Sequence, residues 1–374
     1  MKLWRMPLRT GAFAMLWALA LLTVFGAAAS AAERLGVFPV DSAQVSVSGF
    51  SSGAFMANQL HIAHSAGVMG AAMIAGGLYG CGVQDVEADG VVAPVSRAAG
   101  ACINAFTLDD VKFYKKIVDK LAAKGWIDPP ANLARAKIYF FTGGADAVIP
   151  SDTVEKGRDL YLALGVPAAA VVFEDKSGPA ERAGHSWVTM AFGNPCSANA
   201  PPYINDCHYD QAGAELKAIY GADLAPPAGR ANGRIVAFDQ REFVVDGAAA
   251  ANGLARTGYL YVPKTCEPGA PRPCRLQIAL HGCTQSAEVL RDVFYTKIGL
   301  NEWADSNRII VLYPQAHATT VAELPSSLWL TGVANTNPNG CWNWWGYSGD
   351  AQYLTKRGAQ ISVIWKMVER LEGR

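Results

Sequence analysis

Residues 43–53 read AQVSVSGFSSG, and this stretch decides the fold. Apolar and polar side chains alternate through residues 43–49, a pattern that predicts a β-strand. Residues 49–53 then match Gly-x-Ser-x-Gly, and a helical stretch follows over residues 54–64. A strand, a glycine-bounded turn and a helix are the context in which this pattern exposes a reactive serine above a sheet. A plain Gly/Ser loop is the alternative, but the flanking elements favour Ser51 as a nucleophile.

Further strands alternate with helices along the chain. An amphipathic helix is expected from Thr107, as its N-cap, to about residue 125, and a terminal helix over residues 353–371. Residues 194–275, rich in Pro, Gly and Ala, are expected to form an irregular cover over the core, with hairpin-like pieces such as GYLYVP at residues 258–263. This alternation predicts an α/β fold, with one mostly parallel sheet and helices on both faces. The remaining predicted strands are residues 69–77, 137–142, 170–174, 276–280 and 309–313.

The N-terminal residues have the organisation of a targeting segment. Three basic residues within the first nine positions precede an apolar run over residues 11–25 and a small-residue tract over residues 26–32. This order predicts a signal peptide at residues 1–32 and a single domain at residues 33–374. An uncleaved anchor helix is the alternative, because the apolar run approaches the length of a membrane span. We expect export to the periplasm or the medium, with no membrane anchoring after cleavage.

Composition narrows the classes of function. Of the 374 residues 51% are hydrophobic, and 32 basic residues balance 32 acidic ones. The chain is too apolar for a disordered protein and has no basic excess for nucleic acid. We expect a monomer.

Export changes how the eight cysteines are interpreted, because an even set in an oxidising compartment indicates disulfides. The chain has no Cys-x-x-Cys pair, so we predict neither a metal site nor a cofactor. The sequence leaves connectivity open. The pairs favoured by proximity are Cys81–Cys102, Cys196–Cys207 and Cys266–Cys274, which leaves Cys283 and Cys341 for each other.

A reactive serine needs a histidine to take its proton and a carboxylate to orient that histidine. His185, in Ala-Gly-His-Ser-Trp, follows the predicted strand at residues 170–174 and is our candidate base. Asp146 follows the strand at residues 137–142, at the sheet edge where α/β sites form, and is our candidate carboxylate. Asp152 and Asp175 are the rival carboxylates. His61, His64, His208 and His317 have no supporting pattern.

The oxyanion of an acyl-transfer intermediate needs two N–H donors. One is the amide of Ser52, which follows the nucleophile. The other normally comes from a loop after an early strand, yet Ser51 lies too near the N-terminus for such a loop to precede it. Residues 276–283, LQIALHGC, have the expected form of this loop and offer the amide of Cys283. We therefore predict a circularly permuted α/β-hydrolase, in which the C-terminal part supplies what usually comes first.

Together these blocks resemble the short-chain-length poly(3-hydroxybutyrate) depolymerases with circularly permuted catalytic domains. The matching segments are GFSSGAFMANQL, GGADAVIP, AGHSW, YLYVPKTC, ALHGCTQS and NGCWNWWGYSG. The resemblance implies a secreted serine esterase with Ser51, Asp146 and His185 as its triad, acting on a polyester or on hydroxyalkanoate oligomers.

The resemblance also implies that a tryptophan of CWNWW lines the substrate crevice, with Trp342 first, then Trp344 and Trp345. Aromatic rings pack well against a methyl-bearing polyester, although a cluster that only packs the loop is the alternative. Many extracellular members carry a further polymer-binding domain that we do not find. We therefore expect soluble oligomers or amorphous polymer as substrates.

Two other functions compete with this one. Feruloyl and acetyl-xylan esterases share the HGC and CWNW-like segments, but we expect HGC before Gly-x-Ser-x-Gly in those enzymes. A hydrolase-like protein that only binds polyester or sugar would not need the complete set of Ser, His, Asp and oxyanion positions.

Overall fold

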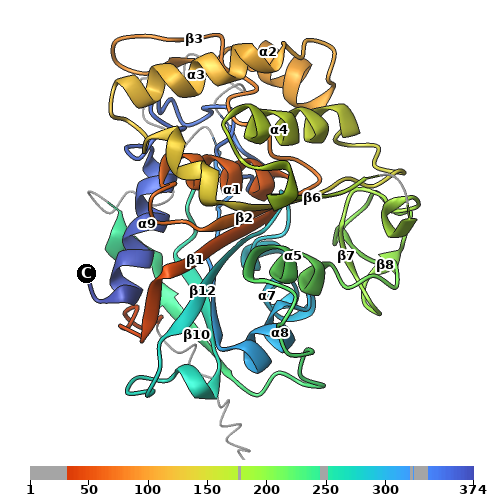
Figure 1. The fold of residues 1–374 in the computed structure, drawn as a ribbon, viewed down its shortest axis with the longest axis vertical. Coiled ribbons are helices and arrows are strands. Elements are labelled where there is room, and N and C mark those ends of the chain that lie inside the picture. Colours follow the sequence, from red (N-terminus) through yellow and green to blue (C-terminus); the bar gives the residue numbers. More distant parts are fainter. Residues whose placement is uncertain (1–31, 176–177, 245–251, 321–322, 324–335) are drawn as a thin grey trace, which may run out of the picture. The chain divides into compact units, whose positions relative to one another are not determined.

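The computed structural model describes residues 32–175, 178–244, 252–320, 323 and 336–374 (Figure 1). The predicted signal peptide thus falls outside the described residues, except for Ala32. The central element is an eight-stranded sheet in the order β10-β11-β13-β12-β1-β2-β5-β6. Its strands are β1 (Val40–Phe50), β2 (Gly70–Ile74), β5 (Lys137–Phe141), β6 (Val171–Glu174), β10 (Arg234–Asp239), β11 (Thr257–Val262), β12 (Cys274–Leu280) and β13 (Ile309–Tyr313).

The sheet is mostly parallel, as predicted. All neighbours from β13 to β6 pair in parallel, whereas β10 and β11 join the edge antiparallel. Alternate residues of each inner strand enter two separate cores, because successive side chains point to opposite faces. In β5, for example, Ile138 and Phe140 pack into one core and Tyr139 and Phe141 into the other.

Helices cover both faces (Figure 1). One face carries α1 (Ser52–Ala63), α3 (Val111–Ala123), α4 (Ser151–Ala163) and α9 (Ala359–Glu372). The other carries α5 (Gln211–Tyr220), α7 (Val293–Lys297) and α8 (Leu300–Asn307). Two short helices, α2 (Val95–Arg97) and α6 (Ala287–Leu290), and a hairpin of β3 (Asp85–Val86) with β4 (Val91–Val92) complete these layers. None of the described helices combines the length and apolarity that crossing a membrane requires.

The position of β1 confirms the permutation. The strands β10 to β13, from the C-terminal part of the chain, all lie on one side of β1, and β2, β5 and β6 lie on the other. β1 pairs in parallel with β12, with Gly49 opposite Leu280. The ends of these two strands therefore meet, which brings HGC beside Gly-x-Ser-x-Gly.

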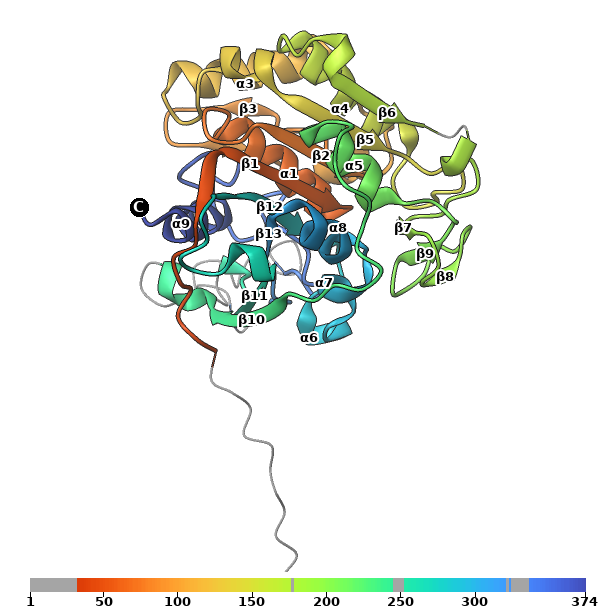
Figure 2. The ribbon, with the colours of Figure 1, turned by 60° about the horizontal axis from the view of Figure 1, so that its bottom comes forward.

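A small second sheet lies beyond the β5–β6 edge (Figure 2). Its order is β7-β9-β8, formed by Trp187–Thr189, Ile204–Asp206 and Asn194–Pro195. The expectation of an irregular cover over residues 194–275 is therefore wrong in part. This region supplies α5, whose first turn is capped by Asp210. The hairpin-like piece expected at residues 258–263 is confirmed as β11, which pairs antiparallel with β10 and with β13.

Two predicted helix starts are also wrong. α3 begins at Val111, and its N-cap is Asp110, whose carboxylate accepts the N–H of Lys112, so Thr107 lies outside the helix. The terminal helix begins at Ala359 rather than at Tyr353. Tyr353 and its neighbours instead form turns, closed by bonds such as Thr355 N–H to the Gln352 carbonyl.

All eight cysteines are paired. The bonds are the four favoured by the sequence: Cys81–Cys102, Cys196–Cys207, Cys266–Cys274 and Cys283–Cys341. The last of these joins segments 58 positions apart and fixes the HGC turn to the tryptophan-rich segment.

Candidate active site

Ser51 sits in a sharp turn between β1 and α1. Its φ of 55° and ψ of −118° are strained for a residue with a side chain, and such strain is common at functional sites. Both flanking glycines are required by close backbone approach. A Cβ on Gly49 would lie 2.0 Å from the carbonyl oxygen of Gly53, and a Cβ on Gly53 would lie 2.3 Å from that of Leu280.

A chain of two hydrogen bonds joins the three predicted residues. The Nε2 atom of His185 lies 2.9 Å from the Ser51 hydroxyl oxygen, and its Nδ1 lies 2.8 Å from Oδ2 of Asp146. The other carboxylate oxygen, Oδ1, accepts the N–H groups of Val148 and Ile149. Ser51 is only 8% exposed and His185 only 3%. The carboxylate is therefore held in one orientation, and it in turn fixes the imidazole.

Two backbone N–H groups are available beside Ser51. Ser52 is the first residue of α1, where amides have no acceptor within the helix. Among the described residues no hydrogen bond engages the amide of Cys283, which follows the end of β12. The pairing of β1 with β12 brings both groups to the same sheet edge.

The loop that carries Cys283 is fixed by two buried side chains, those of Gln285 and His281. The amide oxygen of Gln285 accepts the N–H of Gly282, and its Nε2 donates to the carbonyls of Pro202 and Tyr203. His281 accepts the N–H of Ala316 at Nε2, which leaves the proton on Nδ1. Burial lowers the pKa of His281 to about 4, so this ring stays neutral near pH 7.

This arrangement can perform nucleophilic acyl transfer. A neutral His185 accepts the Ser51 proton, while Asp146 stabilises the imidazolium that results. Two N–H groups at the end of the sheet can donate hydrogen bonds to the oxyanion of a tetrahedral intermediate. The described residues contain no group of three or more metal-ligating side chains.

Comparison with known proteins also points to an ester hydrolase. No family model matches the sequence. The chain is 37% identical over 365 residues to the polyhydroxybutyrate depolymerase of Talaromyces funiculosus, which covers 94% of this chain and 96% of that protein. The chain belongs to the polyhydroxybutyrate depolymerase family. It is also 37% identical over 343 residues to the poly(3-hydroxybutyrate) depolymerase of Delftia acidovorans, covering 91% of this chain but only 62% of that longer protein.

Solved structures of this depolymerase family share the fold. A serine-to-alanine variant of a PHB depolymerase, complexed with an R3HB trimer, matches with a TM-score of 0.76 and 32% identity. The crystal structure of PHB depolymerase from Penicillium funiculosum matches with a TM-score of 0.75 and 33% identity. Each match covers 91% of this chain and 99% of the other.

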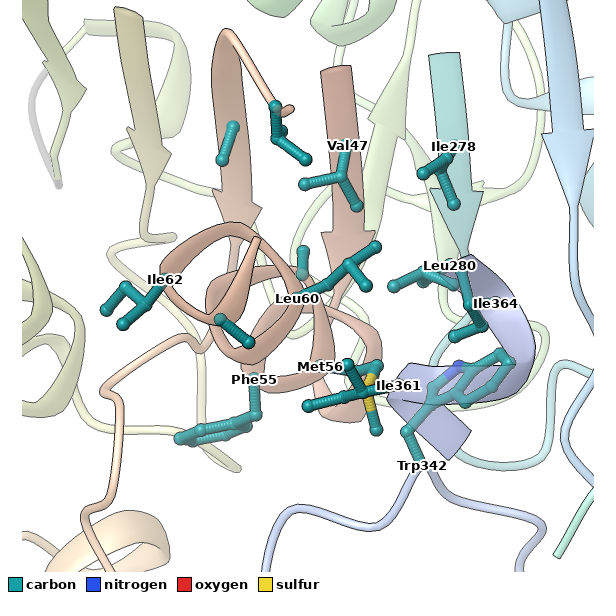
Figure 3. Close-up of a cluster of buried hydrophobic side chains, with 14 of the residues drawn as sticks. Val47, Phe55, Met56, Leu60, Ile62, Ile278, Leu280, Trp342, Ile361 and Ile364 are labelled. Atoms are coloured by element: carbon teal, nitrogen blue, oxygen red, sulfur yellow. The ribbon is translucent and has the colours of Figure 1, made fainter. Parts of the chain in front are cut away.

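The tryptophans differ from the expectation for a depolymerase crevice. Trp342 is fully buried, and its indole N–H donates to the carbonyl of His281. Figure 3 shows its ring beside the α9 residues Ile361 and Ile364. The expectation that Trp342 lines an open crevice is therefore wrong in this structure. Its ring is buried against the loop of residues 281–285, which carries Cys283.

The side chains of Trp344 and Trp345 are partly exposed to solvent. Trp344 stacks on Phe55 of α1 with ring centroids 5.0 Å apart, and Trp345 contacts Tyr347 at 4.8 Å. Both are half-buried, so they remain the candidates for substrate contact.

The other residues considered from the sequence lie elsewhere. His61, on α1, and His64, at its C-terminal end, are buried, whereas Asp152 lies in the first turn of α4. His208 is exposed beside Asp206, and His317 lies between Glu288 and Glu323. Sequence reasoning did not identify Gln285, which ties the oxyanion loop to the Pro202–Tyr203 segment, although it belongs to the ALHGCTQS segment.

Proposed function

We propose that this protein is a serine esterase that hydrolyses the ester bonds of poly(3-hydroxybutyrate) or of its oligomers. The observation that carries the proposal is the hydrogen-bonded order Asp146–His185–Ser51 at the end of a parallel sheet. The relatives supply the substrate class, since they are polyhydroxybutyrate depolymerases and one solved relative holds a 3-hydroxybutyrate trimer.

In the proposed reaction, the Ser51 hydroxyl adds to the ester carbonyl as its proton passes to Nε2 of His185. The amides of Ser52 and Cys283 hold the oxyanion. Collapse of the intermediate breaks the ester bond, and His185 returns the proton to the departing hydroxyl group of the polymer. This leaves a 3-hydroxybutyryl ester on Ser51. Water, deprotonated by His185, then releases the acid and restores the serine.

Product analysis separates this substrate from those of related esterases. Purified protein is incubated with amorphous poly(3-hydroxybutyrate), with soluble trimer and with a feruloyl ester, and the acids released are identified by mass spectrometry. We expect 3-hydroxybutyrate and its short oligomers, with Ser51→Ala inactive on every substrate. Release of ferulate alone would overturn the substrate class. A wild-type protein that a fluorophosphonate probe does not label at Ser51 would overturn the serine mechanism.

We also propose that residues 1–32 are a cleaved signal peptide and that the exported protein, residues 33–374, acts as a soluble monomer. Four disulfides support an oxidising compartment. Intact-mass analysis of protein from the medium and the periplasm tests this directly. A mature chain that begins near residue 33 is expected, and full-length protein retained in the membrane fraction would contradict it.

A further inference from the structure

Asn199 lies between the two loops that hold the acid and the base of the site. It belongs to the segment that follows β8, 14 positions after His185 and 52 positions after Ala147 in the sequence. Its Oδ1 accepts the backbone N–H of His185 at 2.8 Å and that of Ala147 at 2.9 Å. Its Nδ2 donates to the carbonyl of Ala145 at 2.9 Å and to that of Ser197 at 3.3 Å. One side chain thus bonds the residues on both sides of Asp146 and His185 itself.

An amide is the one side chain that fits this arrangement. It offers two acceptor sites and two donors, and here all four are used. A carboxylate could accept the two N–H groups but would face the carbonyl of Ala145 without a proton to donate. An alanine would leave three backbone groups of the two loops without these partners.

The segment that contains Asn199 packs closely against the loop that contains His185. A Cβ on Gly184 would lie 2.3 Å from the carbonyl of Ala198, so the glycine before His185 lets the two segments touch. The N–H of Gly184 also donates to the carbonyl of Cys196, whose disulfide to Cys207 closes the turn. Direct bonds between the acid and base loops exist as well, from Ala145 N–H to the Ala183 carbonyl.

We propose that Asn199 is a positioning residue for the proposed reaction, one that fixes the distance and angle between Asp146 and His185. It does not touch the reacting atoms. Its bonds join the two loops at the point where a shift of either would move the imidazole relative to Ser51. The proposal rests on the proposed esterase function and deepens it.

The test compares Asn199→Ala with Asn205→Ala, a matched control. Asn205 is buried on β9 and donates to the carbonyls of Cys196 and Ala198, in the same turn, but bonds neither triad loop. For Asn199→Ala we expect kcat on a p-nitrophenyl ester to fall by about a hundredfold, as for a small misplacement of a catalytic group, with KM nearly unchanged. The rate of fluorophosphonate labelling of Ser51 should fall in parallel. Asn205→Ala should lose thermal stability but keep kcat within about threefold.

Asn199→Asp provides the rescue, because its carboxylate still accepts the N–H groups of Ala147 and His185. Its kcat should lie between those of the wild type and Asn199→Ala. A folded Asn199→Ala protein with wild-type kcat would overturn the proposal, as would an equal loss of kcat in Asn205→Ala. Failure of the esterase function itself is distinguishable, because the wild type would then show neither turnover nor labelling. Should Asn199→Ala not fold, Asn199→Asp decides alone, with an unchanged kcat and labelling rate counting against the role.

Discussion

The two halves of the site are built in different ways. The nucleophile half comprises Ser51, Ser52 and the loop of residues 281–285, and it lies on the ends of two adjacent central strands. The acid–base half comprises Asp146, His185 and the turn that contains Asn199, and it lies on loops that follow β5 and the edge strand β6. The serine turn of the first half is placed by sheet register and by backbone packing. In the second half the Asn199 side chain, together with backbone bonds, joins the loops that carry Asp146 and His185.

This difference predicts which substitutions affect folding and which affect activity alone. In the nucleophile half a single added carbon meets backbone, as at Gly53. The acid–base half has a similar contact at Gly184, but its loops are also joined by side-chain hydrogen bonds, such as those of Asn199, that substitution can remove one at a time. Damage to the first half should therefore affect folding and activity together, and damage to the second should affect activity first.

Removing either chemical partner should have the largest effect. Ser51→Ala and His185→Ala are each expected to lower kcat on the order of a million-fold, because nucleophile and base act as one unit. The double variant should be no worse than either single one. Steady-state kinetics measures the loss, and circular dichroism checks the fold. A double variant that multiplies the two losses would show that the halves act independently.

Gly53→Ala should destabilise the folded structure of the nucleophile half. Its Cβ would lie 2.3 Å from the carbonyl of Leu280 and 2.5 Å from that of His281. Because backbone cannot yield as a side chain does, we expect the free energy of unfolding to fall by about 3 kcal/mol or more. Gly229→Ala is the control, since nothing lies within 4 Å of a Cβ there. Urea denaturation of both variants measures the difference, and equal midpoints would contradict the packing argument.

The disulfides offer one break in each half. Replacing Cys283 and Cys341 by alanine should cost about 4 kcal/mol by chain entropy, against about 3 kcal/mol for Cys196 and Cys207. The first change should also lower kcat by about a hundredfold, since it frees the loop that bears an oxyanion donor. The second should lower kcat less, because Asn199 still bonds both loops. Kinetics at a temperature where both variants are folded decides, and the reverse order of losses would refute this ranking.

Acid should weaken the nucleophile half in a smaller, graded way. Burial lowers the pKa of His61 to about 3, that of His64 to about 3, and that of His281 to about 4. These groups stay neutral in the folded state while the unfolded chain takes up protons below about pH 6.5. Their contribution to stability is therefore complete above about pH 6.5 and is lost progressively as the pH falls from there to the folded-state pKa values near 4 and 3.

Urea midpoints measured from pH 7 to pH 4 test this prediction. His61→Asn removes one of the buried titrating groups and should reduce the slope of stability against pH, although the variant is less stable at pH 7. An unchanged slope would show that other groups control acid unfolding.

The contrast between the halves also explains what the sequence could reveal. Ser51 and the permutation were predictable, because a motif with fixed spacing and the order of HGC after it reflect sheet register. The partners Asp146 and His185 were predictable as residues that follow strands. The role suggested here for Asn199 was not, since a hydrogen bond between loops has no periodicity or spacing. The burial of Trp342 was missed for a related reason. Its indole N–H donates to the carbonyl of His281, just past the end of β12 and far from Trp342 in the sequence.

The pairing of β1 with β12 has a consequence for synthesis. Gly49 lies opposite Leu280, so the strand that bears the serine is made early but finds its parallel neighbour only after most of the chain exists. Pairing across so long a loop is entropically slow. Until β12 arrives, the Cys283 amide is missing from the site. On the proposed mechanism we expect a chain that still lacks β12 to be inert toward esters, so that the fold delays hydrolytic competence until most of the chain has been made.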